Sequence, residues 1–146
     1  MILDPFMGSG TTGVACMKVV LVHGVWDLLH TGHLAHLEAA RRMGTYLLVS
    51  IVPDKYITKR KPIYSENERI ALLEALRCVN RVVLCDGPGP EKVIKREKPD
   101  LYVRGSDYRW KRMPEYRALK RLRIPTRYTR SVPPRTSEII ERIKNQ

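Results

Sequence analysis

The strongest constraint on the fold is the regular alternation of short apolar runs with segments of helical periodicity. The apolar runs predict strands at 18–23, 46–52, 81–85, 100–103 and 125–129. The intervening segments predict helices at 32–43, 66–77, 90–97, 114–122 and 137–144. This order predicts an α/β protein built as a single-domain, Rossmann-like, doubly wound parallel sheet of about five strands.

Length and cysteine usage narrow the class of protein. A chain of 146 residues is long enough for one domain with a real core. No apolar run approaches the ~18 to 20 residues needed to cross a membrane. The three cysteines, Cys16, Cys78 and Cys85, are odd in number and lack Cys-x-x-Cys spacing. We therefore expect no disulfides and a cytoplasmic location.

Two histidines lie three residues apart directly after the first apolar run. His30 and His33 place two imidazoles one turn apart at the start of a helix, with Thr31 as its expected cap. A helix amino terminus favours anions, and parallel sheets bind ligands at the carboxyl ends of their strands. The pair therefore predicts a phosphate site for phosphoryl or nucleotidyl transfer. A helix cap or a metal half-site are the alternatives, but no Cys or carboxylate cluster nearby completes a metal shell.

A basic loop and a capped helix follow the second predicted strand. Lys59 and Lys61 lie in this loop, and a solvated basic turn is the usual alternative. Ser65 and Glu68 form a capping-box signature, which places the loop at the same sheet edge as the histidine pair. Arg69 follows in the first helical turn, where a surface ion pair is the alternative to an anion contact.

Two further histidines flank the pair. His36 is expected on the helix surface. His23 either lines the nucleotide pocket or ends the strand.

Residues 23–33 resemble the signature of the cytidylyltransferase-like nucleotidyltransferases, Gly-x-Phe-Asp-x-x-His-x-Gly-His, with Trp26 in the place of Phe. The resemblance continues through Lys59 and Lys61, Glu68-Arg69, Arg104-Gly105-Ser106-Asp107-Tyr108, and Thr136 to Ile143. It implies an enzyme that joins a nucleoside triphosphate to a phosphorylated alcohol or sugar. The acceptor phosphate attacks the nucleotide α-phosphate and pyrophosphate leaves. The resemblance also implies Mg²⁺ bound with the triphosphate, and a homodimer.

The resemblance assigns roles residue by residue. Catalysis is assigned to His30, His33 and Lys59. Nucleotide binding is assigned to Gly24, Val25, Trp26, Lys61, Arg104, Gly105, Asp107, Arg130, Ser131, Arg135, Thr136 and Ser137. Acceptor binding is assigned to Asp27, Lys59 and Arg69. No protein residue is assigned as a metal ligand.

The last motif departs from the family pattern. Pro133, Pro134 and Arg135 replace the Gly-Ile-Ser of cytidylyltransferases for glycerol and choline phosphates. Proline has no N–H, so backbone phosphate contacts at those two positions are lost. Thr136 or Ser137 is expected to cap the final helix.

The choice of nucleotide stays open between two alternatives. Arg130 slightly favours CTP. The step Arg104-Gly105-Ser106-Asp107 is similar to the sugar adenylyltransferases of the heptose type, which use ATP and a sugar phosphate.

The net charge of +12 raises an alternative of another class. From Arg104 to Arg130 there are ten Lys or Arg against Asp107 and Glu115. Such a stretch could bind RNA or DNA through phosphates. A triphosphate and a phosphorylated acceptor already require cations, and no recognised nucleic-acid motif is present, so this alternative ranks lower.

Residues 1–16 do not fit the domain predicted for residues 17–146. Asp4 to Gly13 resemble the S-adenosylmethionine-binding motif of amino DNA methyltransferases. The separate Pro-Pro-Tyr motif of those enzymes is absent from the chain. We expect residues 1–16 to be an extension that is dispensable for the domain.

Overall fold

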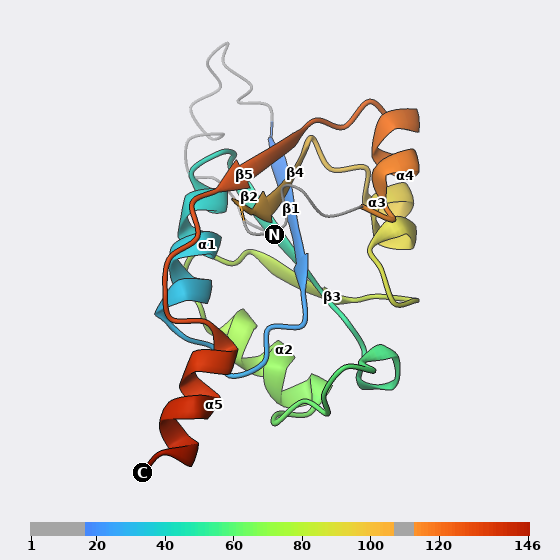
Figure 1. The fold of residues 1–146 in the computed structure, drawn as a ribbon. Coiled ribbons are helices and arrows are strands. Elements are labelled where there is room, and N and C mark those ends of the chain that lie inside the picture. The colour runs from blue at the N-terminus through green and yellow to red at the C-terminus, as the bar shows by residue number, and fades with distance from the viewer. Residues whose placement is uncertain (1–16, 107–112) are drawn as a thin grey trace.

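A computed structural model describes residues 17–106 and 113–146 of the protein. It contains one sheet of five parallel strands in the order β3-β2-β1-β4-β5 (Figure 1). The strands are β1 (Val19–Gly24), β2 (Tyr46–Ile51), β3 (Arg81–Leu84), β4 (Leu101–Gly105) and β5 (Thr126–Thr129). The predicted doubly wound parallel sheet is confirmed. Residues 1–16 and Asp107 lie outside the described residues.

Helices cover both faces of the sheet. They are α1 (Thr31–Arg41), α2 (Glu66–Glu74), α3 (Glu91–Glu97), α4 (Tyr116–Arg121) and α5 (Thr136–Lys144), with a short 3₁₀ turn η2 (Asp54–Tyr56) that the sequence did not predict. The apolar residues of α1 and α2 pack on one face, and those of α3 and α4 on the other. Helix α5 extends away from the sheet (Figure 1). Within the described residues, no helix is long and apolar enough to span a membrane.

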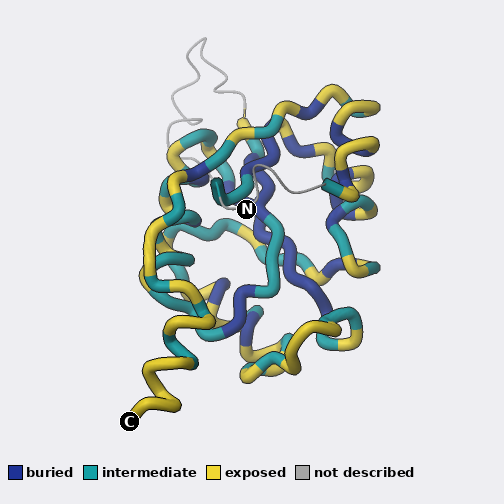
Figure 2. Tube along the Cα trace, in the orientation of Figure 1, coloured by how far each residue is buried: buried dark blue, intermediate teal, exposed yellow. Residues whose placement is uncertain are grey.

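The central strands are buried because both faces of the sheet are covered. Val20 and Val22 point into the core beneath α1, whereas Leu21 points into the core beneath α3 and α4. All three are fully buried, and Figure 2 shows this buried centre beside the exposed α5. The fully apolar run at the start of the domain is thus explained by burial on two sides.

The strand order places the candidate site. The chain adds β2 and β3 on one side of β1, and β4 and β5 on the other. Strands β1 and β4 are therefore neighbours whose following segments diverge, which is where ligands bind in open α/β sheets. The segment after β1 carries the histidine pair, and Arg104 lies near the end of the adjacent β4.

Candidate active site

His30 itself caps helix α1. Its Nδ1 accepts a hydrogen bond from the backbone N–H of His33 at 3.2 Å, so the cap is His30 and not the predicted Thr31. Because a backbone N–H can only donate, a neutral His30 ring carries its proton on Nε2. That nitrogen lies 3.3 Å from Oγ1 of Thr136, whose hydroxyl donates to the backbone oxygen of Asp27. Capping thus occupies one nitrogen of His30 and directs the other towards the start of α5.

The two histidines stack on each other. Their ring centroids are 3.8 Å apart and the ring planes differ by 19°. Nδ1 of His33 is buried and has no hydrogen-bond partner among the described residues. Burial, followed by the proximity of His30 and His36, lowers the pKa of His33 to about 3. Burial also lowers the pKa of His30. His33 is therefore neutral at pH 7, and its buried Nδ1 is an exception to the rule that buried polar atoms are hydrogen-bonded.

Trp26 packs against His33, one member of this pair. Its indole is only 5% exposed, donates from Nε1 to the Ser50 backbone oxygen at 3.0 Å, and meets the His33 ring edge-on with centroids 5.4 Å apart. A Cβ at Gly24 would lie 3.0 Å from the indole, which explains the glycine there. A nucleotide contact by Trp26 stays a prediction; the ring itself lies in the core.

His36 is not the helix-surface residue that was predicted. Its ring stacks on Trp26, with centroids 5.8 Å apart and planes 21° apart, and its Nδ1 bonds Oγ1 of Thr129. Burial lowers the pKa of His36 to about 4. The sequence pattern that indicated this position is the spacing of the histidines, because His30, His33 and His36 are each three residues apart.

The altered last motif lies directly along α1. A Cβ at Gly32 would lie 2.5 Å from the backbone oxygen of Pro134 and 2.6 Å from that of Val132. Only a glycine lets this segment approach so closely. Figure 1 shows the segment between β5 and α5 running beside α1. At the β5 end of this segment, the Ser131 N–H donates to Oγ of Ser106 at 3.0 Å.

The cap of α5 also differs from the prediction. Arg135 occupies the N-cap position, and its backbone N–H is bonded by the Glu138 carboxylate at 3.2 Å. Thr136 is the first helical residue. Its hydroxyl contacts Nε2 of His30 and donates to the backbone oxygen of Asp27, so it does not cap the helix. The side chains of Arg130, Arg135 and Ser137 are exposed, so their nucleotide contacts remain predictions.

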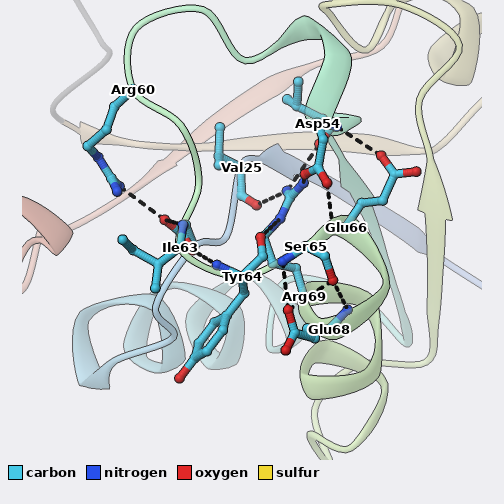
Figure 3. Close-up of polar contacts among 11 residues, drawn as sticks. Val25, Asp54, Arg60, Ile63, Tyr64, Ser65, Glu66, Glu68 and Arg69 are labelled. Carbon is cyan, nitrogen blue, oxygen red and sulfur yellow. Dashed lines mark hydrogen bonds and ion pairs between the residues drawn. The ribbon is translucent and has the colours of Figure 1, made fainter.

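Asp27 anchors the basic loop. The Asp27 carboxylate is 3% exposed and accepts hydrogen bonds from the N–H groups of Ile63 and Tyr64 and from Arg60, at 2.9, 3.0 and 3.1 Å. Figure 3 labels these three donor residues. Burial alone would raise its pKa, but these bonds and the Arg60 charge hold the pKa of Asp27 below its usual value. A contact between Asp27 and the phosphorylated acceptor substrate, which the resemblance predicted, would compete with these three hydrogen bonds.

Within this loop the cation that pairs with Asp27 is Arg60, whereas the sequence predicted roles for Lys59 and Lys61. Lys59 and Lys61 flank it and are both exposed. Lys61 also lines a cavity of about 590 Å³ together with Asp54, Thr58 and Ser65. The anchor at Arg60 thus leaves the two lysines available at the surface, where their catalytic and nucleotide-binding roles remain predictions.

Arg69 joins the ends of two strands. Its guanidinium is fully buried and donates to the backbone oxygens of Tyr64, Val25 and Val52, at 3.2, 2.6 and 3.1 Å. It also pairs with Asp54 at 2.5 Å (Figure 3). The predicted alternative of a surface ion pair is wrong. The predicted acceptor contact does not fit either, because protein atoms enclose the whole side chain.

His23 and Arg104 lie near the carboxyl ends of the neighbouring strands β1 and β4. Nδ1 of His23 lies 2.7 Å from Oγ of Ser50 and 3.5 Å from Sγ of Cys85. Burial and then the positive charge of Arg104 lower the pKa of His23 to about 4. The Arg104 side chain is 15% exposed and lies 3.8 Å from the Glu115 carboxylate. Gly105 pairs with Thr129 of β5. His23 is therefore the second-last residue of β1, close enough to Arg104 for that charge to affect its pKa, and its contact with a nucleotide stays a prediction.

The family described as cytidylyltransferase-like matches residues 21–142. The bifunctional protein HldE of Helicobacter pylori strain Shi470 is 36% identical over 134 residues, covering 87% of this chain and 28% of that protein. HldE of Citrifermentans bemidjiense is 41% identical over 95 residues, covering 62% and 20%. The chain thus spans only 20 to 28% of the length of these relatives.

A solved structure is also similar. It is the lipopolysaccharide core biosynthesis protein from Thermoplasma volcanium GSS1, with a TM-score of 0.66 and 27% sequence identity. The match covers 82% of this chain and 99% of that one.

Proposed function

The chain belongs to the cytidylyltransferase-like family of nucleotidyltransferases, and we propose that it transfers an adenylyl group from ATP to a heptose-type sugar phosphate. The observation that carries this proposal is the stacked pair His30 and His33 at the start of α1, beside the divergence of β1 and β4. The amino terminus of α1, where this pair lies, favours a phosphate.

The reaction is a displacement at phosphorus. An oxygen of the acceptor phosphate forms a bond to the α-phosphorus, the bond to the bridging oxygen breaks, and pyrophosphate leaves with its electron pair. No covalent enzyme intermediate is needed, so the protein positions the groups and stabilises charge. His33, with its lowered pKa, contributes a hydrogen bond and not a charge to the incoming nucleotide. Positive charge comes instead from Lys59, Lys61 and Arg104.

The nature of the acceptor is supported by the relatives. The repeated matches to HldE proteins agree with the resemblance of the Arg104-Gly105-Ser106 step to heptose-type adenylyltransferases. Cytidylyl transfer to a phosphorylated alcohol is the second candidate, because Arg130 matches that branch of the family. The segment at Pro133 and Pro134 weakens the second candidate, since it turns two backbone oxygens towards Gly32 and has no N–H at either proline.

Mg²⁺ belongs to the proposal as a companion of the triphosphate. It would compensate negative charge on the phosphates. In residues 17–106 and 113–146 there is no group of three or more His, Cys, Asp or Glu suited to hold a metal. Phosphate oxygens would therefore supply most of its ligands.

A pyrophosphate-release screen tests the proposal. ATP and CTP are each offered with heptose 1-phosphate, other sugar 1-phosphates, glycerol 3-phosphate and phosphocholine. Release with ATP and a sugar 1-phosphate is expected. Release only with CTP and a phosphorylated alcohol would establish the second candidate. Absence of release, together with steeply salt-dependent oligonucleotide binding, would favour the nucleic-acid-binding alternative.

A further inference from the structure

A continuous series of contacts runs from the end of β5 to the histidine pair. Thr129 is the last residue of β5, is 4% exposed, and bonds Nδ1 of His36. The His36 ring stacks on Trp26, and the Trp26 and His33 rings meet in an edge-type arrangement. His33 in turn stacks on His30.

Two contacts other than His36 restrict the position of the Trp26 indole ring. Its Nε1 is tethered to the Ser50 backbone oxygen, and its ring lies against Gly24. His36 and His33 both contact the indole ring, so a displaced His36 ring would change the surface on which His33 rests. His36 is held by its single side-chain hydrogen bond to Thr129 among the described residues.

We propose that His36 is a positioning residue that, through its bond to Thr129, fixes Trp26 and thereby sets the orientation of the His33 ring. This inference rests on the proposed function insofar as His33 serves the α-phosphate. It also links the segment after β5, which carries Arg130 and Ser131, to the histidine pair: the segment follows Thr129 in the chain, and Thr129 bonds His36, which contacts His33 through Trp26.

The hydrogen bond between His36 and Thr129 can be removed by substituting either residue with a side chain of similar shape. His36→Phe keeps a stacked ring and removes the nitrogen. Thr129→Val removes the hydroxyl, whereas Thr129→Ser retains it. Glu38→Gln, at an exposed position of the same helix, is the matched control. Melting temperatures confirm that each variant folds.

Two readouts separate this inference from the proposed function. The first is kinetic: His36→Phe, Thr129→Val and their double variant should each lower kcat about tenfold, because misplacement of a catalytic group slows the chemical step. The KM for the nucleotide should change less than about twofold, since ground-state binding is untouched. Thr129→Ser and Glu38→Gln should stay within about twofold of the native kcat.

The second readout is the NMR spectrum of the ligand-free protein, which has four histidines and two tryptophans. Ring resonances of Trp26 and His33 should shift in Thr129→Val and not in Thr129→Ser. This result would support the coupling even if no triphosphate were turned over, in which case only the proposed function fails. Unchanged His33 resonances in Thr129→Val would overturn the inference. A native kcat in His36→Phe, or a double variant whose loss is the product of the single losses, would also overturn it.

Discussion

Replacing the buried Arg69 by lysine should destabilise the protein by about 3 kcal/mol. The guanidinium donates to three backbone oxygens and to the Asp54 carboxylate, with no exposed surface. An ammonium group keeps the charge but offers its donors from one point, so it cannot span the ends of both strands. Each buried oxygen left unpaired costs about 1 to 3 kcal/mol, and lysine leaves at least one or two in that state.

Urea unfolding followed by circular dichroism measures this loss, and Arg96→Lys is the matched control. Arg96 also pairs with two carboxylates, those of Asp86 and Glu97, but its side chain is 48% exposed. Exposed pairs contribute about 0 to 1 kcal/mol, so the control should change little. For a chain of this size, a loss of about 3 kcal/mol lowers Tm by roughly 6 to 12 °C. Equal losses in the two variants would refute the structural role given to Arg69.

Three further predictions concern the histidines, the basic loop and the domain boundary. The folded-state pKa values of His23, His33 and His36 lie at about 4, 3 and 4, below the ordinary 6.5. The unfolded chain therefore takes up protons first as the pH falls. Stability should be constant above about pH 6.5 and decrease below it by up to about 1.4 kcal/mol per pH unit for each histidine; flat urea midpoints between pH 7 and 5 would contradict this. Asp27→Asn should loosen the loop at Arg60 and cause faster tryptic cleavage there, whereas the exposed Asp86→Asn should not; equal cleavage rates would argue against the anchor. A chain beginning at Met17 should keep the Tm and pyrophosphate release of the full chain, and loss of either would show that residues 1–16 belong to the domain.

The elements could be predicted from the sequence because their signals are local. Apolar runs such as Val19 to Val22 reflect burial on both sides of a parallel strand, and helical spacing reflects one covered face. The placement of His30, His33 and the basic loop at one edge then follows from parallel topology, since all carboxyl ends of the strands meet there.

The missed features depend on contacts between distant segments. Which of three consecutive cations is anchored is decided by Asp27, which lies 33 residues before Arg60. Whether Arg69 is exposed depends on how the ends of β1 and β2 meet around it. The caps at His30 and Arg135 escaped prediction because neither is a usual capping residue. In each case a local rule was overridden by tertiary structure.

Pyrophosphate release by the native chain and by His33→Ala tests the central claim most directly. The assay uses ATP, Mg²⁺ and heptose 1-phosphate, with circular dichroism and Tm confirming that the variant is folded. If the histidine pair holds the α-phosphate in the transition state, the native chain releases pyrophosphate and the variant loses at least about a hundredfold in kcat. Native turnover by a folded His33→Ala variant would contradict the account.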